Sequence, residues 1–127
     1  MRRKFYQFIL AEVLASLWAV LIFRLLSDRI MAAVLAGLGF VSLGLFIVHA
    51  LRHHSRKGSL VTYWLAWIHL FVFSIPMLTF RLLKPDADFS QVHILWWTGP
   101  QFHGASEMFF LVLVVGTIFD CFRAPKA

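Results

Sequence analysis

Four long apolar stretches dominate the pattern of hydrophobic and polar positions along this chain. They cover residues 5–26, 30–51, 60–83 and 99–122, and ionisable side chains interrupt each of them rarely. At a rise of ~1.5 Å per residue, about 20 residues of helix cross the ~30 Å hydrocarbon layer of a bilayer. The pattern therefore predicts an all-α polytopic membrane protein, a four-helix transmembrane bundle built as a single domain over residues 1–127.

The connections between these stretches are short and polar, which predicts an up-down-up-down order of neighbouring helices. Ser27, Asp28 and Arg29 form the first turn, and a basic loop precedes the third stretch. Residues 84–98 end in a pair of tryptophans followed by Thr98. Because tryptophan prefers the headgroup region, we expect this segment to lie in the extracytoplasmic interface.

The distribution of Lys and Arg predicts the orientation. With four spans, eight basic residues fall on the side of both termini: Arg2, Arg3, Lys4, Arg52, Arg56, Lys57, Arg123 and Lys126. Four fall on the other side: Arg24, Arg29, Arg81 and Lys84. Basic residues accumulate on the cytoplasmic side of membranes. We therefore expect both termini to be cytoplasmic and the protein to lie in a bacterial inner (cytoplasmic) membrane.

Composition supports the lipid bilayer as the main partner and argues against nucleic acid. Hydrophobic residues make up 61% of the chain, and the mean hydropathy is +0.80. The formal net charge is +6, but the basic residues sit in short clusters between apolar runs. Membrane orientation explains such clusters better than a nucleic-acid surface does.

Small residues recur on the first two stretches at spacings that allow close helix packing. On these faces we expect the two helices to pack against each other. The alternative is that the small residues only fill the helices. The positions are Ala11, Ala15 and Ala19 on the first stretch and Ala33, Gly37 and Gly44 on the second.

The third stretch carries one ionisable residue near its middle, His69, and one helix breaker, Pro76. They are seven residues apart, as are Thr62 and His69, so we expect all three on one helical face. Proline has no N–H to donate, and the carbonyl of Val72 needs another partner. A polar face of this kind must lie against protein and not against lipid.

Two layers of polar residues follow from depths estimated at ~1.5 Å per residue. In the inner layer Glu12 lies about 10 Å above Phe5, and His69 about 13 Å above Leu60, so we predict an intramembrane pair. Such a pair could relay protons, or Glu12 could be protonated and only hydrogen-bond a neighbouring helix. The outer layer contains Arg24, Arg81, His103 and Glu107.

His103 and Glu107 are separated by one helical turn and could form half of a metal site, with His93 as a third ligand. The alternative is a layer of ion pairs in which Glu107 pairs with Arg24 or Arg81. A haem held by two histidines is not expected, because the estimated depths of the candidate pairs differ by about 10 Å. We therefore expect no cofactor beyond a bound metal.

The start of the last helix has a specific local signal. Thr98 and Gln101 have the spacing of a capping box, and Trp97 and Phe102 that of a hydrophobic staple. The helix is therefore expected to begin near Gly99.

Three functional hypotheses remain open after these observations. The first is a non-catalytic inner-membrane protein that acts through helix packing, as an accessory or assembly subunit of another membrane protein or as a homo-oligomer. The second is a small proton-coupled transporter that uses Glu12, His69 and Glu107. The third is a membrane metal or redox enzyme with its metal at the His93, His103 and Glu107 positions.

Overall fold

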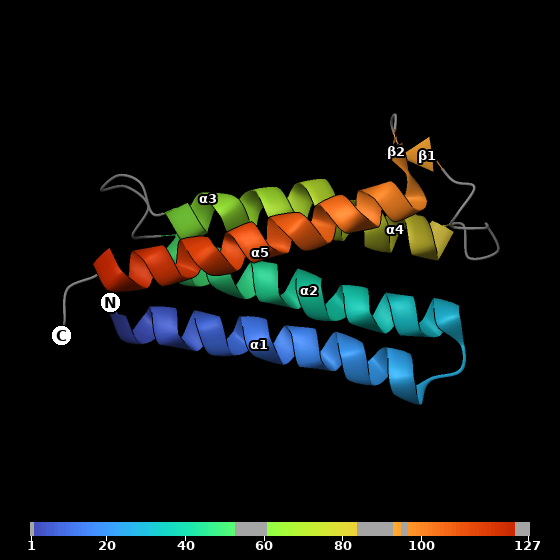
Figure 1. Ribbon diagram of the computed structural model, residues 1–127, viewed down its shortest axis with the longest axis horizontal. Helices are drawn as coiled ribbons and strands as arrows, with labels where there is room; N and C mark the ends of the chain where they lie inside the picture. The colour runs from blue at the N-terminus through green and yellow to red at the C-terminus, as the bar shows by residue number, and fades with distance from the viewer. Residues whose placement is uncertain (1, 53–60, 84–92, 95–96, 124–127) are drawn as a thin grey trace.

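Four long helices form the protein in the computed structural model, which describes residues 2–52, 61–83, 93–94 and 97–123 (Figure 1). Each helix is long and apolar enough to span a membrane. The predicted all-helical fold with four candidate spans is thus confirmed at this level. The basic loop before the third span, and most of the expected interfacial segment, lie outside the described residues.

The helix bounds lie close to the predicted stretches. The elements are α1 (Arg2–Leu25), α2 (Arg29–Leu51), α3 (Val61–Ile68), the π-helical segment η2 (His69–Ser74), α4 (Ile75–Leu83) and α5 (Gly99–Arg123). The segments α3, η2 and α4 together form the third span. Two short antiparallel strands, β1 (His93–Ile94) and β2 (Trp97–Thr98), precede α5 and were not predicted.

The four spans form a closed ring in which each packs against two antiparallel neighbours. α1 lies beside α2 and α5, and the third span also lies beside α2 and α5. The described start and end of the chain lie at the same end of the bundle (Figure 1). Asp28 makes the first tight turn possible, because its carboxylate caps α2 by accepting from the N–H groups of Ile30 and Met31 at 3.0 and 3.2 Å.

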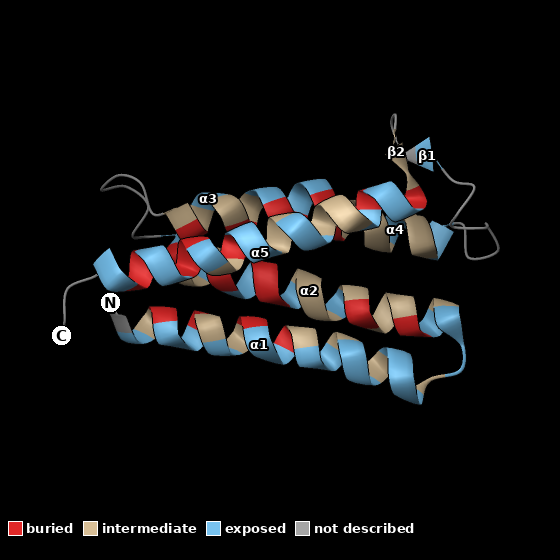
Figure 2. Ribbon diagram, in the orientation of Figure 1, coloured by how far each residue is buried: buried red, intermediate tan, exposed pale blue. Residues whose placement is uncertain are grey.

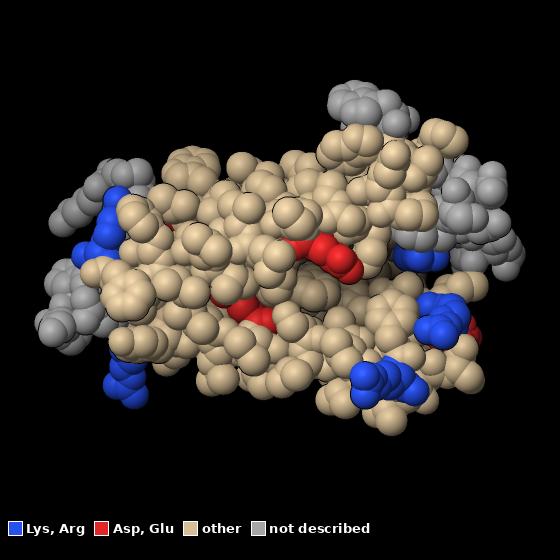
Figure 3. Space-filling view, in the orientation of Figure 1, with Lys and Arg blue, Asp and Glu red and all other residues tan. Residues whose placement is uncertain are grey.

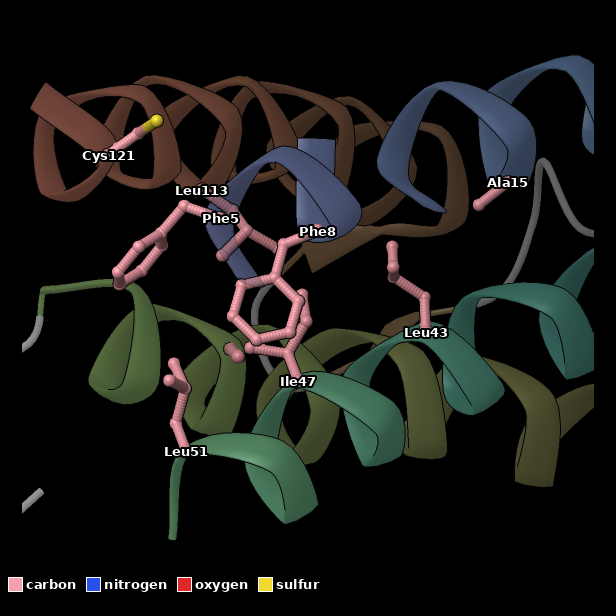
Figure 4. Close-up of a cluster of buried hydrophobic side chains, with 9 residues drawn as sticks. Phe5, Phe8, Ala15, Leu43, Ile47, Leu51, Leu113 and Cys121 are labelled. Carbon is pink, nitrogen blue, oxygen red and sulfur yellow. The ribbon is translucent and has the colours of Figure 1, made fainter. Parts of the chain in front are cut away.

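The dense part of the core lies in the half of the bundle nearest the termini. Among the described residues of α1, none beyond Ala15 is buried, and α4 has no buried residue. Figure 2 shows this as buried positions confined to one half of α1. The cluster contains Phe5, Phe8, Ala15, Leu43, Ile47, Leu51, Ala66, Leu113 and Cys121 (Figure 4). The other half of the bundle is consequently packed less tightly.

Pro76 is accommodated by the wide π-helical turn that precedes it. The N–H of Ile75 bonds the carbonyl of Leu70, five residues back, where a regular helix would bond four residues back. This turn holds one residue more than an α-helical turn. The expected helix break is therefore a local widening, and the span continues as α4 directly after it.

The predicted capping box at the start of α5 is confirmed. The N–H of Thr98 donates to Oε1 of Gln101 at 3.0 Å, and the N–H of Gln101 donates to Oγ1 of Thr98 at 3.3 Å. The rings of Trp97 and Phe102 lie with centroids 6.1 Å apart, as the staple requires. The helix begins at Gly99.

Thr98→Ala should destabilise the start of α5, because it removes the acceptor for one otherwise unpaired N–H. A loss of about 1 kcal/mol is typical of such a cap. Hydrogen exchange of the amides at 101–103 should speed up, while exchange at 113–120 should not change. Thr98→Ser, which keeps the hydroxyl, is the control. Unchanged exchange in Thr98→Ala would show that the box does not stabilise the helix end.

Candidate functional site

A buried polar layer joins α1, α3 and α5 near the end of the bundle that holds the termini. Glu12 is 1% exposed, and its Oε1 accepts a hydrogen bond from Oγ1 of Thr117 at 2.6 Å. The same hydroxyl lies 2.8 Å from the carbonyl oxygen of Leu113. Among the described residues, Oε2 of Glu12 has no hydrogen-bond partner. The α1 carboxyl group is thus held by α5 through one oxygen only.

The second carboxyl group of this layer caps a helix from a different part of the chain. Oδ2 of Asp120, on α5, accepts from both the backbone N–H and the hydroxyl of Thr62, at 2.7 Å each. Thr62 lies in the first turn of α3, where backbone N–H groups have no partner within their own helix. Asp120 is 1% exposed, and Arg123 lies 3.8 Å from its other oxygen. A carboxylate on the fourth span therefore caps the first turn of the third span.

The sequence did not reveal this contact. Asp120 lies in the last turn of its helix, and the sequence predicted no partner for it. The available signal was that the end of α5 and the start of α3 must lie at the same end of an up-down-up-down bundle.

His69 occupies a separate, aromatic environment. Its Nδ1 lies 3.2 Å from Oγ of Ser74, a contact that the π turn makes possible. The rings of Phe40, Phe109 and Phe110 surround it, with centroids 6.3, 6.2 and 5.7 Å away. The histidine is 3% exposed.

The predicted Glu12–His69 pair is therefore not formed as a direct contact among the described residues. Glu12 bonds Thr117, whereas His69 lies against Phe110, seven residues or about 10 Å further along α5. The depth estimate counted each span from its first apolar residue. The contacts with α5 show that this assumption does not hold, because they place Glu12 closer to the terminal end than His69.

A cavity of about 470 Å³ fills the loosely packed half of the bundle and is lined by all four spans. Two of these spans leave space for the cavity because their lining residues are small. These residues are Ala19 on α1, and Ala33, Ala36 and Gly37 on α2. The polar residues on its walls are Ser16, His69, Ser74, Arg81, His103, Ser106 and Glu107. Figure 3 shows a hollow beside acidic side chains on this long face, with basic side chains gathered at the two ends of the molecule.

The predicted outer polar layer is only partly assembled. His103 and Glu107 are in contact, with Nε2 and Oε1 2.8 Å apart, and their side chains are 58% and 69% exposed. Both line the cavity, as does the half-buried Arg81. Arg24 is exposed in the last turn of α1 and is not among the lining residues.

The predicted metal site at His93, His103 and Glu107 is wrong. Within the described parts of the chain, no group of three His, Cys, Asp or Glu residues is close enough to hold a metal ion. His93 is exposed in β1, whereas His103 already contacts Glu107 within α5. Spacing along the helix could show the half-site, but not where the preceding strand would carry His93.

The small-residue faces pack within the chain, with partners other than those expected. A Cβ added to Gly44 would lie 3.1 Å from Cβ of Leu70, and one added to Gly37 would lie 3.2 Å from Cδ1 of Leu78. Both glycines thus allow the third span to pack closely against α2. The prediction had been that they would pack against α1.

On the α1 side, Ala15 is buried and Ala11 packs against the core. The close approach of α1 and α2 occurs instead at Gly39, where an added Cβ would lie 2.6 Å from the indole of Trp18. That indole donates to the carbonyl of Leu35 at 2.9 Å. The interface between α1 and α2 therefore depends on the indole of Trp18, which packs directly against Gly39.

Comparison with known proteins adds no relative. No protein-family model, no curated protein and no solved structure matches this chain.

Proposed function

We propose that this chain is a small integral membrane carrier whose substrate occupies the cavity between its four spans. The cavity is the observation that carries the proposal. Its volume of about 470 Å³ lies in the range typical of small-molecule sites. It combines apolar walls with a few polar side chains, as such sites do. In this proposal the chain lies in a bacterial inner membrane with both termini cytoplasmic, so the cavity occupies the extracytoplasmic half.

Glu12 supports a proton-coupled mechanism. Its carboxyl group is buried below the cavity and has one oxygen without a partner among the described residues. Ser16 links the two regions, because it lines the cavity and donates to the backbone carbonyl of Glu12 at 3.1 Å. Ionisable residues within membrane spans commonly mark ion or proton pathways. Glu12 would hold the coupled proton and the cavity the substrate.

The helix-packing hypothesis has less support. It was motivated by small-residue faces that seemed available to another protein. Gly37 and Gly44 lie against the third span, and Ala15 lies in the core. These residues therefore do not require a partner to explain them.

A carrier must expose its cavity to water on each side of the membrane in turn. We would test this with a cysteine at Ser106 on the cavity wall, in a Cys121→Ser background, and a charged, membrane-impermeant thiol reagent. We expect labelling both in intact cells and in inverted membrane vesicles. Val112→Cys, at an exposed position on the apolar surface of α5, is the control and should be labelled in neither.

The outcomes separate the hypotheses. Labelling of Ser106→Cys from one side only would overturn carriage and leave a static cavity. An absence of labelling from both sides would also overturn it, because the cavity would then not be reached by water.

A further inference from the structure

We infer that the cavity opens sideways into the bilayer and takes up the single hydrocarbon chain of an amphiphile with an uncharged hydroxyl head group. This inference rests on the proposed function, since it names the substrate class of the same cavity. Four observations carry it: the position of the opening, the depth of the cavity, the pairing of its polar groups and its volume.

The opening lies between α1 and α5, in the half of the bundle farther from the termini. In the other half these two helices are joined by the hydrogen bond from Thr117 to Glu12. Among the described residues of α1, none beyond Ala15 is buried. The two ribbons separate toward the end opposite the termini (Figure 1). The hollow in Figure 3 accordingly lies on a long face of the molecule.

Apolar side chains at this opening belong both to the cavity and to the outer surface. Val20, Phe23 and Leu111 line the cavity, yet they are 51%, 39% and 57% exposed. In a chain that spans a membrane, exposed apolar side chains face lipid tails, which are as apolar as leucine. A hydrocarbon chain can therefore pass from the bilayer into the cavity without leaving apolar surroundings.

The depth of the cavity suits a chain that lies along the bundle within one leaflet. Its walls extend over residues 16–23 on α1, 33–40 on α2 and 103–111 on α5. At ~1.5 Å per residue, each wall is about 10–12 Å long. One leaflet supplies half of the ~30 Å hydrocarbon layer. Each wall begins about one turn from the helix end opposite the termini, so the cavity lies in a single leaflet.

Polar groups deep in the cavity are paired within the protein. Oγ of Ser16 donates to the carbonyl of Glu12 at 3.1 Å, and Nδ1 of His69 lies 3.2 Å from Oγ of Ser74. Buried polar groups that already have partners need none from a ligand. The inner part of the cavity can therefore hold an apolar chain without leaving these groups unsatisfied.

Glu107 supplies an acceptor for the hydroxyl head group. It lines the cavity one turn before Leu111, and its side chain is 69% exposed. Its Oε1 lies 2.8 Å from Nε2 of His103, and an ionised carboxylate has further lone pairs for a hydroxyl donor. An anionic head group would be repelled by this carboxylate. A cationic head group is the competing class that the experiment must reject.

The volume of the cavity admits one chain. At ~30 Å³ for a water-sized group such as a methylene, the cavity of about 470 Å³ holds about 16 such groups. This is the size of a single long acyl chain. A lipid with two chains of that length would need twice the space.

The test uses three lipids with a diazirine in the middle of the chain: hexadecanol, hexadecylammonium and dipalmitoylglycerol. The full chain is irradiated with each probe in phosphatidylcholine nanodiscs, and labelled residues are mapped by mass spectrometry. Phe73 is the readout, because it lines the cavity and is buried from lipid on the outer surface. Met108, exposed on α5 and outside the lining, reports surface labelling.

We expect hexadecanol to label both Phe73 and Met108, and the other two probes to label only Met108. An excess of hexadecanol without the diazirine should remove labelling at Phe73, because the site is saturable. Labelling at Met108 should persist, because lipid at the outer surface is not bound at a single site.

Ala19→Leu narrows the cavity from α1 and should reduce hexadecanol labelling of Phe73 about tenfold, since added methylenes overpack an occupied site. Ala105→Leu is the matched control: it makes the same change at a half-buried position of α5 outside the lining, and labelling should persist. If Ala19→Leu does not fold, Ala33→Leu narrows the cavity from α2 and should have the same effect.

Labelling confined to Met108 with all three probes would overturn the inference, as would labelling of Phe73 that persists in the narrowed variants. Equal labelling of Phe73 by dipalmitoylglycerol would overturn the single chain, and equal labelling by hexadecylammonium the uncharged head group.

Failure here is distinguishable from failure of the carrier proposal. If Ser106→Cys reacts with the thiol reagent from both sides but hexadecanol does not label Phe73, the ligand class is wrong. If hexadecanol labels Phe73 but Ser106→Cys reacts from one side only, the ligand class stands and carriage is wrong.

Discussion

Asp120→Ala is expected to lower the free energy of unfolding by about 3 kcal/mol, because two buried donors lose a charged acceptor at once. Both the N–H and the hydroxyl of Thr62 donate to this carboxylate at 2.7 Å. The N–H has no alternative within α3, since it lies in the first turn. Unfolding titrations in mixed detergent micelles would measure the loss.

Two matched variants show whether the connection between spans causes the effect. Asp28→Ala removes another aspartate cap, but this cap is exposed and lies next to its own helix, so about 1 kcal/mol is expected. Asp120→Asn keeps an acceptor oxygen and should fall between. Combining Asp120→Ala with Thr62→Val should cost less than the sum of the two single changes. Equal losses for Asp120→Ala and Asp28→Ala would refute the interpretation.

Deleting Val72 together with Pro76→Ala should leave the bundle folded, although it shortens the middle of a span. Val72 is an exposed residue of the π turn. The deletion removes the one residue by which this turn exceeds an α-helical turn. The substitution removes the ring that would otherwise clash with a carbonyl of the restored helix. The face that lines the cavity after the turn would keep its orientation, so thermal unfolding should resemble that of the parent.

The control is deletion of Val115, which is also exposed but lies in the regular helix α5. It rotates Thr117 and Asp120 by about 100° relative to the first half of α5. Their contacts with Glu12 and Thr62 would be lost together, and we expect the protein not to fold. If the protein tolerates both deletions, or neither, then the π turn does not contain one residue more than a regular helix would need at this place.

The spans and the start of α5 could be predicted because they depend on short-range patterns. Hydropathy over about 20 residues defines a span, and the capping box lies within four residues of sequence. The partners of Glu12 and Asp120 could not be predicted, because each depends on how far one helix is displaced along another. The displacement estimated from the sequence was wrong by a few residues, and Glu12 therefore bonds Thr117 and not the predicted partner His69.

The π turn had a similar effect on the outer half of the third span. Counting seven residues from His69 led to Pro76, although the extra residue brings Ser74 and Arg81 to that face instead. Pro76 signalled a disturbance in the helix but not its kind. The cavity depends on both unknowns, the displacement of α1 and the rotation of α4, and was therefore not predictable.

The cap on α3 also has a consequence for biosynthesis. Thr62 and Asp120 are 58 residues apart, and Glu12 and Thr117 are 105 residues apart. At about 5–20 residues per second, the ribosome makes the first partner of each contact several seconds before the second. Until α5 emerges, the start of α3 and the carboxyl group of Glu12 both lack the groups that satisfy them. A nascent chain truncated before Gly116 should therefore be a preferred target of quality-control proteases, and completion of the last helix should end that susceptibility.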